Sequence, residues 1–461
     1  MKFENINIEL LKKYDRPGPR YTSYPPAPAF SKDFGPDDYK NAIVENNLQN
    51  STADLSLYFH IPFCDTLCYF CGCNMLVTHR RETIRKYLDY LEKEIDMVWK
   101  LISPKRKVTQ LHWGGGTPSY LNPDEIKELG EFINERFQYV DDPEVGVEID
   151  PRGLTYEHMK AFREVGFNRI SMGVQDFDPK VQKAVNRIQP EEITKQAIDW
   201  ARELGFKSIN LDLIYGLPFQ TLESFEKTID KVIELSPERL AVFNFAYVPW
   251  LKPHQRVIKK EDLPAPEIKL QILKMTIEKL TDAGYIYIGM DHFAKPDDEL
   301  AIAQKEKTLY RNFQGYSTRA GADLYAFGMS AISQFQNIYA QNYKELKDYY
   351  ARIDEGKLPT AIGYRMNQDD IIRKHVIMRL MCDMELTKSE VEKKFNINFD
   401  EYFADSIPKL QEFIEDGLVE LTDDKIIVTL MGRLVIRNIA MCFDAYIEKM
   451  MREKPIFSRT V

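Results

Sequence analysis

Short apolar runs alternate with longer amphipathic segments from residue 55 to about residue 249. Four of these amphipathic segments repeat their apolar residues at helical spacing: 81–102, 123–137, 191–205 and 222–235. Six runs between them have the length and residue types of buried strands: LSLYFHI (55–61), VTQLHW (108–113), VGVEI (145–149), RISMGV (169–174), INLDLIY (209–215) and LAVFNFAYV (240–248). Successive strand–helix units predict parallel strands joined by right-handed crossovers. The pattern therefore predicts an α/β fold, and six units instead of eight predict an open, partial (β/α)6 barrel of TIM-like design.

The chain changes character on both sides of this region. Residues 1–50 are predicted to form an N-terminal arm, since the stretch DRPGPRYTSYPPAPAF is too rich in proline for a regular helix. Residues 51–350 hold the barrel and its extension, and residues 351–461 form a smaller, mostly helical C-terminal domain. In that domain 369–395 and 403–421 have helical patterns, and 424–447 predicts a short strand before a closing helix. This order is similar to a winged helix, but the segment lacks a basic face, so a lid over the barrel is expected instead of a nucleic-acid-binding module.

The composition of the chain argues against nucleic-acid binding and against a membrane-spanning protein. The 461 residues include 62 basic and 71 acidic ones, a formal net charge of −9, and neither sign forms a long block, which argues against nucleic acid as a partner. No apolar run is long enough to predict a membrane span. The chain opens on charged residues without an apolar signal segment, so a reducing, cytoplasmic location is expected.

Four of the six cysteines lie in one stretch, HIPFCDTLCYFCGCN, at residues 60–74. Disulfides are not expected in a reducing compartment, so these thiols predict metal binding or redox chemistry. Structural zinc usually takes two separated C-x2-C pairs, whereas an iron–sulfur cluster accepts thiolates from a single loop. The spacing favours a cluster and leaves zinc as the alternative, with Cys382 and Cys442 as small buried hydrophobes.

Polar residues and glycines stand where the predicted strands end, which is the catalytic edge of such barrels. They are His60, Gly114 to Gly116, Glu148, Asp150, Gln175, Asn210, Asp212, Asn244 and, beside them, Ala246. Simpler roles stay open for several of them. The glycines also suit a tight turn, Glu148 also suits an ion pair with Arg187 or Arg152, and His60 also suits a strand cap. His112, between Leu111 and Trp113, is expected to be a buried core histidine.

The cysteine stretch, preceded by YFHIPF and with Phe70 before its third cysteine, resembles the signature of radical S-adenosylmethionine enzymes. Other segments narrow the resemblance to the oxygen-independent coproporphyrinogen III oxidases, also called coproporphyrinogen dehydrogenases. They are GPRYTSYP (18–25), LHWGGGTPSYL (111–121), VEIDPR (147–152), NRISMGVQDF (168–177), NLDLIYGLP (210–218), IGMDHFA (288–294), RNFQGYST (311–318) and RNIAMCFD (437–444). These segments run in order along almost the whole chain.

The resemblance implies specific roles for residues of this chain. Cys64, Cys68 and Cys71 would hold a [4Fe-4S] cluster whose open iron binds S-adenosylmethionine. A second S-adenosylmethionine would lie beside the first. The resemblance assigns catalytic roles to Tyr58, His60 and Glu148. Cys73 matches a cysteine position of the family that does not bind the cluster. The residues expected to bind the two molecules of S-adenosylmethionine are Tyr58, Phe70, Gly115, Gly116, Thr117, Glu148, Gln175, Arg187, Asp212, Ala246 and Ile332.

The implied reaction is the anaerobic conversion of two propionate side chains of coproporphyrinogen III to vinyl groups, giving protoporphyrinogen IX in heme biosynthesis. A 5′-deoxyadenosyl radical would start it. Arg20 and Arg311 are expected to bind substrate carboxylates, since a guanidinium pairs with a carboxylate through two hydrogen bonds. The arm is expected to cover the substrate. The chain is expected to act as a monomer with an electron donor and an electron acceptor that the sequence does not identify.

Two other functions stay open. One is a heme-binding or heme-delivery protein of the same superfamily, against which GPRYTSYP and Cys73 argue. The other is a zinc-stabilised α/β protein without redox chemistry.

Overall fold

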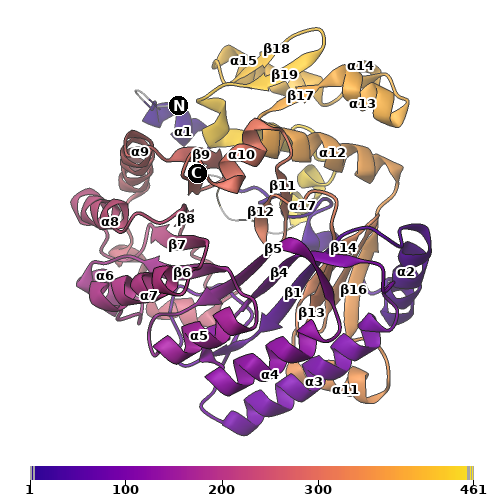
Figure 1. Ribbon diagram of the computed structural model, residues 1–461. Coiled ribbons are helices and arrows are strands. Elements are labelled where there is room, and N and C mark those ends of the chain that lie inside the picture. The colour runs from indigo at the N-terminus through magenta and orange to yellow at the C-terminus, as the bar shows by residue number, and fades with distance from the viewer. Residues whose placement is uncertain (1–2, 4–5, 454–456, 458, 460–461) are drawn as a thin grey trace.

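A curved, open sheet organises the computed structural model, which describes residues 3, 6–453, 457 and 459 (Figure 1). Its order is β16-β15-β14-β13-β1-β4-β5-β6-β7-β8-β10-β9. The six predicted strands are the parallel centre of this sheet, adjacent in chain order: β1 (Leu55–Ile61), β4 (Lys107–Gly115), β5 (Gln138–Ile149), β6 (Arg169–Gln175), β7 (Ser208–Tyr215) and β8 (Arg239–Asn244). The α/β class and the partial barrel are confirmed. The last predicted run is too long, because residues 245–248 leave the sheet after β8.

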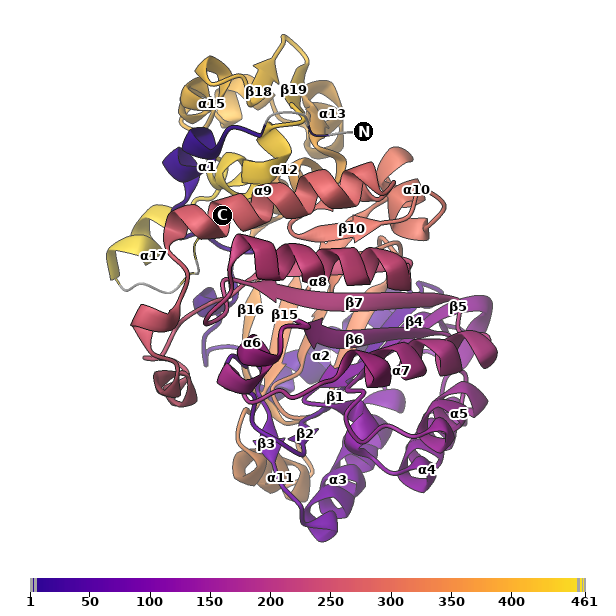
Figure 2. The same cartoon turned by 90° about the vertical axis from the view of Figure 1, so that its left-hand side faces the viewer.

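Helices connect these strands and cover the outer side of the sheet (Figures 1 and 2). They are α3 (Arg81–Trp99), α4 (Pro123–Asn134), α5 (Tyr156–Glu164), α6 (Pro179–Ala184), α7 (Glu191–Glu203) and α8 (Leu222–Leu235). Each long helix follows from its pattern: α8 buries Phe225, Ile229 and Val232, which recur every three or four residues. Asn122 and Thr221 begin α4 and α8 with capping boxes, which satisfy backbone N–H groups that helix starts leave unpaired.

Short strands extend the sheet at both edges, and the sequence pattern missed them. β13 (Asp323–Phe327) runs parallel to β1 and leads into three antiparallel strands, β14 (Ile332–Phe335), β15 (Ile338–Asn342) and β16 (Thr360–Arg365). At the other edge β8 pairs with β10 (His292–Ala294), and β10 pairs with β9 (Ile286–Gly289). Strands of three to six residues carry too few positions for alternation to be recognised.

The remaining elements between the barrel strands and the C-terminal part are mostly short. They are β2 (Phe63–Cys64), β3 (Leu76–Val77), α9 (Pro266–Asp282), α10 (Glu299–Lys305), β11 (Tyr310–Asn312), β12 (Gly315–Ser317), α11 (Leu346–Asp354) and the 3-10 turns η2 (Pro118–Tyr120), η3 (Pro253–Val257) and η4 (Lys260–Asp262). β2 and β3 pair with each other and frame the cysteine loop.

The N-terminal region consists of α1 (Ile8–Tyr14), an irregular stretch with one 3-10 turn, η1 (Ala27–Ala29), and α2 (Pro36–Gln49). The proline-rich stretch forms no α-helix, as predicted. It is nevertheless well packed, since Tyr21 and Tyr24 are fully buried. Part of the arm prediction concerns residues 1–2 and 4–5, which lie outside the described residues.

The C-terminal part combines helices with a small three-stranded sheet of order β17-β19-β18 (top of Figure 1). Its elements are α12 (Gln368–Asp383), β17 (Glu385–Thr387), α13 (Lys388–Phe395), α14 (Phe399–Tyr402), η5 (Ile407–Leu410), α15 (Gln411–Glu415), β18 (Val419–Leu421), β19 (Lys425–Val428), η6 (Gly432–Val435), α16 (Ile436–Met441) and α17 (Ile447–Glu453). The two helical predictions here were partly wrong, because β17 interrupts 369–395 and β18 ends 403–421. Both strands find partners in β19 that the local pattern does not reveal.

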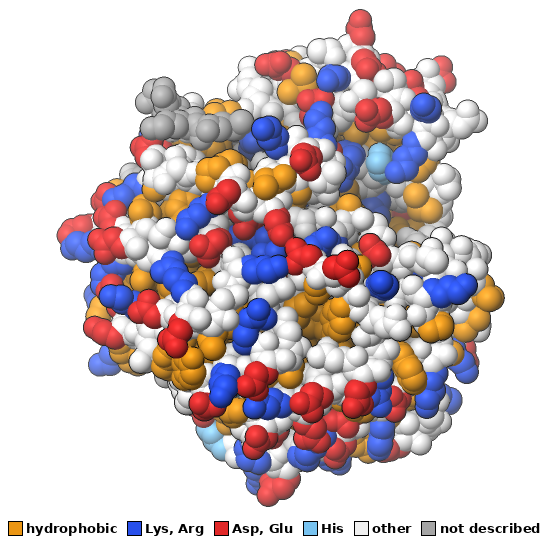
Figure 3. Space-filling model, in the orientation of Figure 1, with side chains coloured by type: hydrophobic (Ala, Val, Ile, Leu, Met, Phe, Trp, Pro, Cys, Tyr) orange, Lys and Arg blue, Asp and Glu red, His pale blue; other side chains and the backbone are white. Residues whose placement is uncertain are grey.

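The surface agrees with a balanced charge. On the face of Figure 3, Lys and Arg are interspersed with Asp and Glu and form no continuous basic area. Within the described residues, no helix has both the length and the apolar character that crossing a bilayer requires.

Candidate active site

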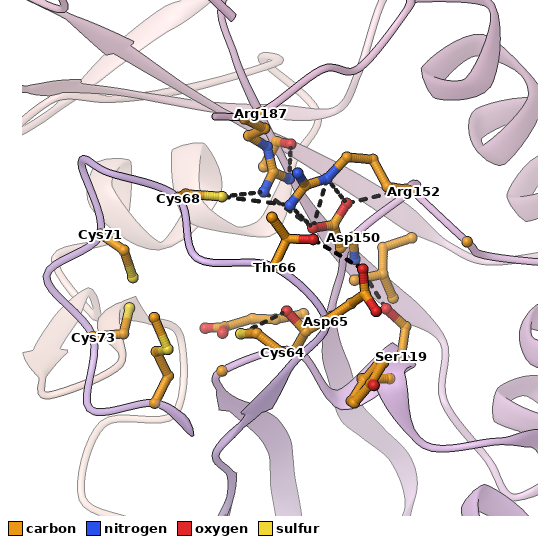
Figure 4. Close-up of a pocket in the computed structure, with 18 of the residues that line it drawn as sticks. Cys64, Asp65, Thr66, Cys68, Cys71, Cys73, Ser119, Asp150, Arg152 and Arg187 are labelled. Atoms are coloured by element: carbon orange, nitrogen blue, oxygen red, sulfur yellow. Dashed lines mark hydrogen bonds and ion pairs between the residues drawn. The ribbon is translucent and has the colours of Figure 1, made fainter. Parts of the chain in front are cut away.

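The cysteine loop borders a cavity of about 1020 Å³ at the carboxyl ends of the parallel strands (Figure 4). Cys64 stands at the end of β2, and the loop then carries the other three thiols past the cavity. Residues from the loop and from five strand ends line this space. Those predicted for the site are Cys64, Cys68, Phe70, Cys71, Cys73, Gly116, Thr117, Glu148, Gln175, Arg187 and Asp212.

The glycine run after β4 is hydrogen-bonded to the residues that lead into the cysteine loop. The N–H groups of Gly116 and Thr117 donate to the carbonyls of Ile61 and Phe63, at 2.8 Å each. A Cβ on Gly116 would come within 2.5 Å of the Pro62 backbone, and one on Gly115, whose φ is +117°, would come within 2.6 Å of the His60 ring. The glycines are therefore required for close packing as well as for the turn.

Glu148 faces the cavity from β5, and 45% of its side-chain surface is accessible there. Its carboxylate lies 3.4 Å from Nε2 of His112 and accepts the N–H of Gly115 at 3.2 Å. Burial opposes the charge, but His112 and the Gly115 N–H outweigh it and hold the pKa of Glu148 below its usual range. The alternative ion pair of Glu148 with Arg187 or Arg152 was wrong. His112 was also misjudged, because it contacts the site and is not enclosed in the core.

Asp150 is the partner of both arginines. It binds Arg152 at 2.7 Å and Arg187 at 3.1 Å. The same two guanidinium groups approach the Sγ of Cys68 at 3.4 Å and 3.7 Å, as Figure 4 shows. The two arginines thus connect Cys68 of the loop with Asp150 at the end of β5.

The other cysteines differ in their surroundings. Cys71 and Cys73 face each other, and their hydrogen bond holds the pKa of Cys71 below its usual range, with Lys252 and His254 acting in the same direction against burial (Figure 4). Cys64 lies 3.4 Å from the hydroxyl of Thr117. Cys382 and Cys442 are buried far from the loop, as predicted for small hydrophobes.

Gln175 and Asp212 complete the floor of the cavity from β6 and β7. Gln175 has a left-handed backbone with φ of +69°, which a side chain seldom adopts, and its buried Oε1 has no hydrogen-bond partner among the described residues. Asp212 accepts the amide of Asn210 at 2.8 Å and the hydroxyl of Ser171 at 3.3 Å. Burial raises the pKa of Asp212 to about 6.

Tyr58 and His60 do not line the cavity but contact residues around it. The Tyr58 hydroxyl lies 3.1 Å from Nδ1 of His60, whose Nε2 lies 2.8 Å from the carbonyl of Asn74 in the cysteine loop. Tyr58 also stacks on His112 with ring centroids 6.1 Å apart. Both residues thus contact the groups that line the cavity without lining it themselves.

Ala246 and Ile332 are two further predicted site residues that do not line this cavity. Ala246 is exposed in the segment after β8. Ile332 begins β14 and packs in a separate apolar cluster with Phe30, Phe313 and Tyr339.

The residues present suit an iron–sulfur cluster and an amino-acid ligand. Four thiols of one loop line a single cavity, and two arginines contact one of them, Cys68. The unpartnered Gln175 Oε1 and the accessible Glu148 offer hydrogen-bond acceptors to a ligand with donor groups.

A second cluster of cations lies next to the cavity, behind Phe243, one of its lining residues. The Arg20 guanidinium lies 5.5 Å from the centre of the Phe243 ring and forms an ion pair with Asp291 at 3.0 Å. Arg311 is 2% exposed and donates to the Arg20 carbonyl at 3.1 Å. Its Nη1 has no hydrogen-bond partner among the described residues, and burial lowers the pKa of Arg311.

Sequence reasoning missed the contributions of His112, Arg152 and Phe243. A signal existed for His112: side chains alternate across a strand, so Gln110, His112 and Gly114 share the polar face of β4, opposite Leu111 and Trp113. For Phe243 no local signal existed, because an aromatic residue in a strand is ordinarily core.

Comparison with known proteins gives concordant matches. Residues 58–232 match the Radical SAM superfamily, and residues 366–435 match the HemN C-terminal domain. The oxygen-independent coproporphyrinogen III oxidase of Synechocystis sp. is 48% identical over 460 residues, 99% of this chain and 98% of its own. The Escherichia coli protein of the same name is 49% identical over 455 residues, with the same coverage. A solved structure described as "Coproporphyrinogen III oxidase (HemN) from Escherichia coli is a Radical SAM enzyme" matches 96% of this chain and 99% of its own, with 48% identity and a TM-score of 0.91.

Proposed function

The chain belongs to the oxygen-independent coproporphyrinogen III oxidases of the radical SAM superfamily, and from this membership we propose how its residues divide the work. It is an oxidoreductase of heme biosynthesis that oxidises coproporphyrinogen III without oxygen. Its family implies a [4Fe-4S] cluster and S-adenosylmethionine. The observation that carries the proposal is that Cys64, Cys68, Cys71 and Glu148 line one cavity.

Cys64, Cys68 and Cys71 hold the cluster in this proposal, and Cys73 is not a ligand. When bound, the cluster and S-adenosylmethionine supply the radical that takes a hydrogen atom from a propionate β-carbon. Arg152 and Arg187 contact the Sγ of Cys68, and Asp150 holds both guanidinium groups in place. The hydrogen bonds that Gly116 and Thr117 donate to the carbonyls of Ile61 and Phe63 fix the position of the cysteine loop at the cavity.

Glu148 accepts hydrogen bonds from the amino group of S-adenosylmethionine. His112 and the Gly115 N–H keep the carboxylate charged and aimed into the cavity. Tyr58 and His60 act by holding His112 and the cysteine loop in place, which supports a positioning role for both. The roles of Phe70, Ala246 and Ile332 stay predictions.

We also propose that two molecules of S-adenosylmethionine bind side by side. A drug-sized ligand generally occupies a pocket of about 300–1,000 Å³. The volume of about 1020 Å³ leaves room for more than one ligand. We propose that Gln175 and Asp212, which line the same cavity, contact one of the two molecules.

Arg20 and Arg311 bind propionate carboxylates of the substrate. The partnerless Nη1 of Arg311 supports this role, because a buried guanidinium gains from a carboxylate partner. The arm that carries Arg20 closes the cavity on the side of Phe243 and limits the entry of water. In this proposal, two propionate side chains of the substrate would each lose a hydrogen atom to the radical, one electron to the acceptor and one CO2, which leaves a vinyl group.

Three further proposals complete this view. The protein works as a monomer, receives electrons from a separate donor and passes the substrate's electrons to a separate acceptor. Thiolates that hold a cluster require a reducing compartment, which favours the cytoplasm.

One assay tests the function. The purified protein, reconstituted anaerobically with iron and sulfide, is incubated with coproporphyrinogen III, S-adenosylmethionine and dithionite. We expect protoporphyrinogen IX, methionine and 5′-deoxyadenosine. Tight binding of heme without any decarboxylation would replace the oxidase by a heme-delivery protein. One zinc per chain without sulfide would contradict the cluster.

A further inference from the structure

The segment that follows β8, residues 246–260, projects from the molecule before the chain enters α9 (Figure 2). It exposes three large apolar side chains close together in sequence: Trp250 is 57% exposed, Leu251 58% and Val257 59%. Large apolar residues gathered in one exposed segment commonly mark an interaction surface.

This segment is attached directly to the cysteine loop. The Lys252 ammonium donates to the Cys73 carbonyl at 2.9 Å, and the Gln255 amide donates to the Phe70 carbonyl at 3.1 Å. Nε2 of His254 lies 2.8 Å from the Cys71 carbonyl. Three backbone carbonyls of the loop that carries the thiols, those of Phe70, Cys71 and Cys73, are thus contacted by one exposed segment.

A separate apolar cluster fixes the geometry of this attachment. Ile258 is buried with Phe245 and Leu217, and Tyr69 and Phe70 of the cysteine loop pack against them. The segment that carries the exposed side chains is therefore anchored to the barrel and to the cysteine loop by buried residues. Such anchoring is what a docking surface needs, because ordering a flexible loop on binding would cost free energy.

The charge of the segment contrasts with that of the whole chain. Residues 246–260 contain Lys252, Arg256, Lys259 and Lys260 and no acidic residue, whereas the chain carries a formal net charge of −9. Arg256, Lys259 and Lys260 are exposed. Glu261 and Asp262 follow and limit the basic area at that end.

We propose that residues 246–260 form the docking surface for a small acidic protein that carries one electron and delivers it to the cluster at Cys64, Cys68 and Cys71. The inference rests on the proposed function. The basic residues of the segment attract an acidic partner. The apolar side chains of Trp250, Leu251 and Val257 form the centre of the interface, from which water is excluded on binding. The carrier loses one electron, the iron–sulfur centre gains it, and no atom is transferred. The contacts of Lys252, His254 and Gln255 place the docked carrier against the backbone of the ligand loop.

The test uses the reconstituted enzyme and, as probe, a reduced plant-type ferredoxin, an acidic carrier of one electron. The variant Arg256→Glu/Lys259→Glu/Lys260→Glu reverses the exposed charges and leaves the loop contacts intact. We expect its affinity for ferredoxin, measured by calorimetry with and without cluster, to fall at least about tenfold. The rate of cluster bleaching by ferredoxin should fall in parallel, and wild-type affinity should weaken as salt rises. Trp250→Ser should weaken binding without changing the salt dependence.

The control variant Lys40→Glu/Lys105→Glu/Lys195→Glu makes the same change in net charge at exposed lysines elsewhere and should bind ferredoxin as the wild type does. Basic cytochrome c should not bind the wild-type surface. Dithionite should bleach the cluster equally in all variants, which separates a failed docking surface from an absent cluster. Equal ferredoxin affinity in the wild type and the first variant, or no salt-sensitive binding at all, would overturn the proposal.

Discussion

Glu148, near the end of β5, and Asp150, just after it, have different tasks because their neighbours differ. Asp150 forms ion pairs with Arg152 and Arg187, so its negative charge is compensated by side chains of the protein itself. Glu148 contacts His112 and the Gly115 N–H and keeps accessible surface toward the cavity. Burial opposes both charges, and these partners outweigh it, so the pKa of each carboxyl lies below its usual range. Only Glu148 is placed to accept hydrogen bonds from a ligand.

The first prediction separates ligand thiols from the neighbouring thiol. Alanine at Cys64, Cys68 or Cys71 should each abolish the iron–sulfur absorbance after reconstitution, because two thiolates retain a cube poorly. Cys73→Ser should keep about four irons per chain. Iron analysis and visible absorbance measure both. Loss of iron in Cys73→Ser together with retention in Cys71→Ser would show that the ligand assignment is wrong.

At the scale of elements, α3 ties together the ends of β1 and β13 through buried polar groups. Glu94 of α3 accepts the Gly328 N–H at 2.7 Å and the side chains of Asn342 and Tyr349 at 2.6 Å each. Tyr87, two turns earlier, donates to the His60 carbonyl at 2.6 Å. The strand end that carries His60 is therefore positioned by a helix on the outer side of the sheet.

The second prediction follows from the burial of Glu94, which raises its pKa from 4.5 to about 7. The hydrogen bonds from Tyr349, Gly328 and Asn342 act in the opposite direction and offset only part of this effect. The folded protein holds this proton more tightly than the unfolded chain does. The resulting stabilisation is complete below pH 4.5 and is lost as the pH rises to about 7. Relative to Glu94→Gln, the free energy of unfolding of the wild type should fall by about 3 kcal/mol over this interval and stay level above it.

Urea unfolding of both proteins at several pH values measures this difference. Comparison with Glu94→Gln cancels the other titrating groups. A difference that does not change with pH would mean that Glu94 keeps an ordinary pKa in the folded protein.

The third prediction concerns the arm. Arg20→Gln removes the guanidinium beside Phe243, so protoporphyrinogen formation should fall about 10- to 100-fold, as expected for a lost hydrogen bond to a charged group. Cleavage of S-adenosylmethionine should stay measurable and become uncoupled from product. Methionine and protoporphyrinogen are quantified in the same reaction. Arg16→Gln, an exposed change on the same arm, is the control. Coupled, undiminished turnover in Arg20→Gln would remove it from the substrate site.

At the scale of the whole molecule, the two ends of the chain hold each other. Arg437 of α16 donates to the carbonyls of Gly18 and Pro19, and Asn438 donates to the Tyr14 carbonyl at 2.9 Å. The Tyr14 ring stacks on Phe413, with centroids 4.7 Å apart. The arm thus bridges the C-terminal part and the barrel, and Arg20 reaches the cavity because α16 fixes the residues before it.

The fourth prediction tests this bridge. Arg437→Met leaves buried carbonyls without their charged donor, which should cost at least about 1.5–3 kcal/mol of unfolding free energy. The arm should become sensitive to limited proteolysis between residues 15 and 25, and product formation should fall with it. Exposed Arg452→Met should change neither. An arm that stays resistant in Arg437→Met would show that other contacts suffice to hold it.

Much of the barrel and of the cysteine site was determined by local sequence. Apolar runs between helical patterns sufficed for the six central strands, since a strand buried on both faces is apolar over most of its length. Thiol spacing sufficed to favour a cluster, because one loop can present its ligands without help from distant residues. Motif resemblance sufficed for the family.

Tertiary structure decided how these residues are paired. Whether Arg152 and Arg187 meet Glu148 or Asp150 depends on the twist of β5 against the loops around it, which no local pattern contains. The pairing of β13 with β1, the contact of Arg311 with Arg20 and the packing of the arm against α16 depend on contacts between residues hundreds of positions apart. The strand pattern carries only the alternation of faces, whereas a pairing depends on which side chains the fold brings within hydrogen-bond distance.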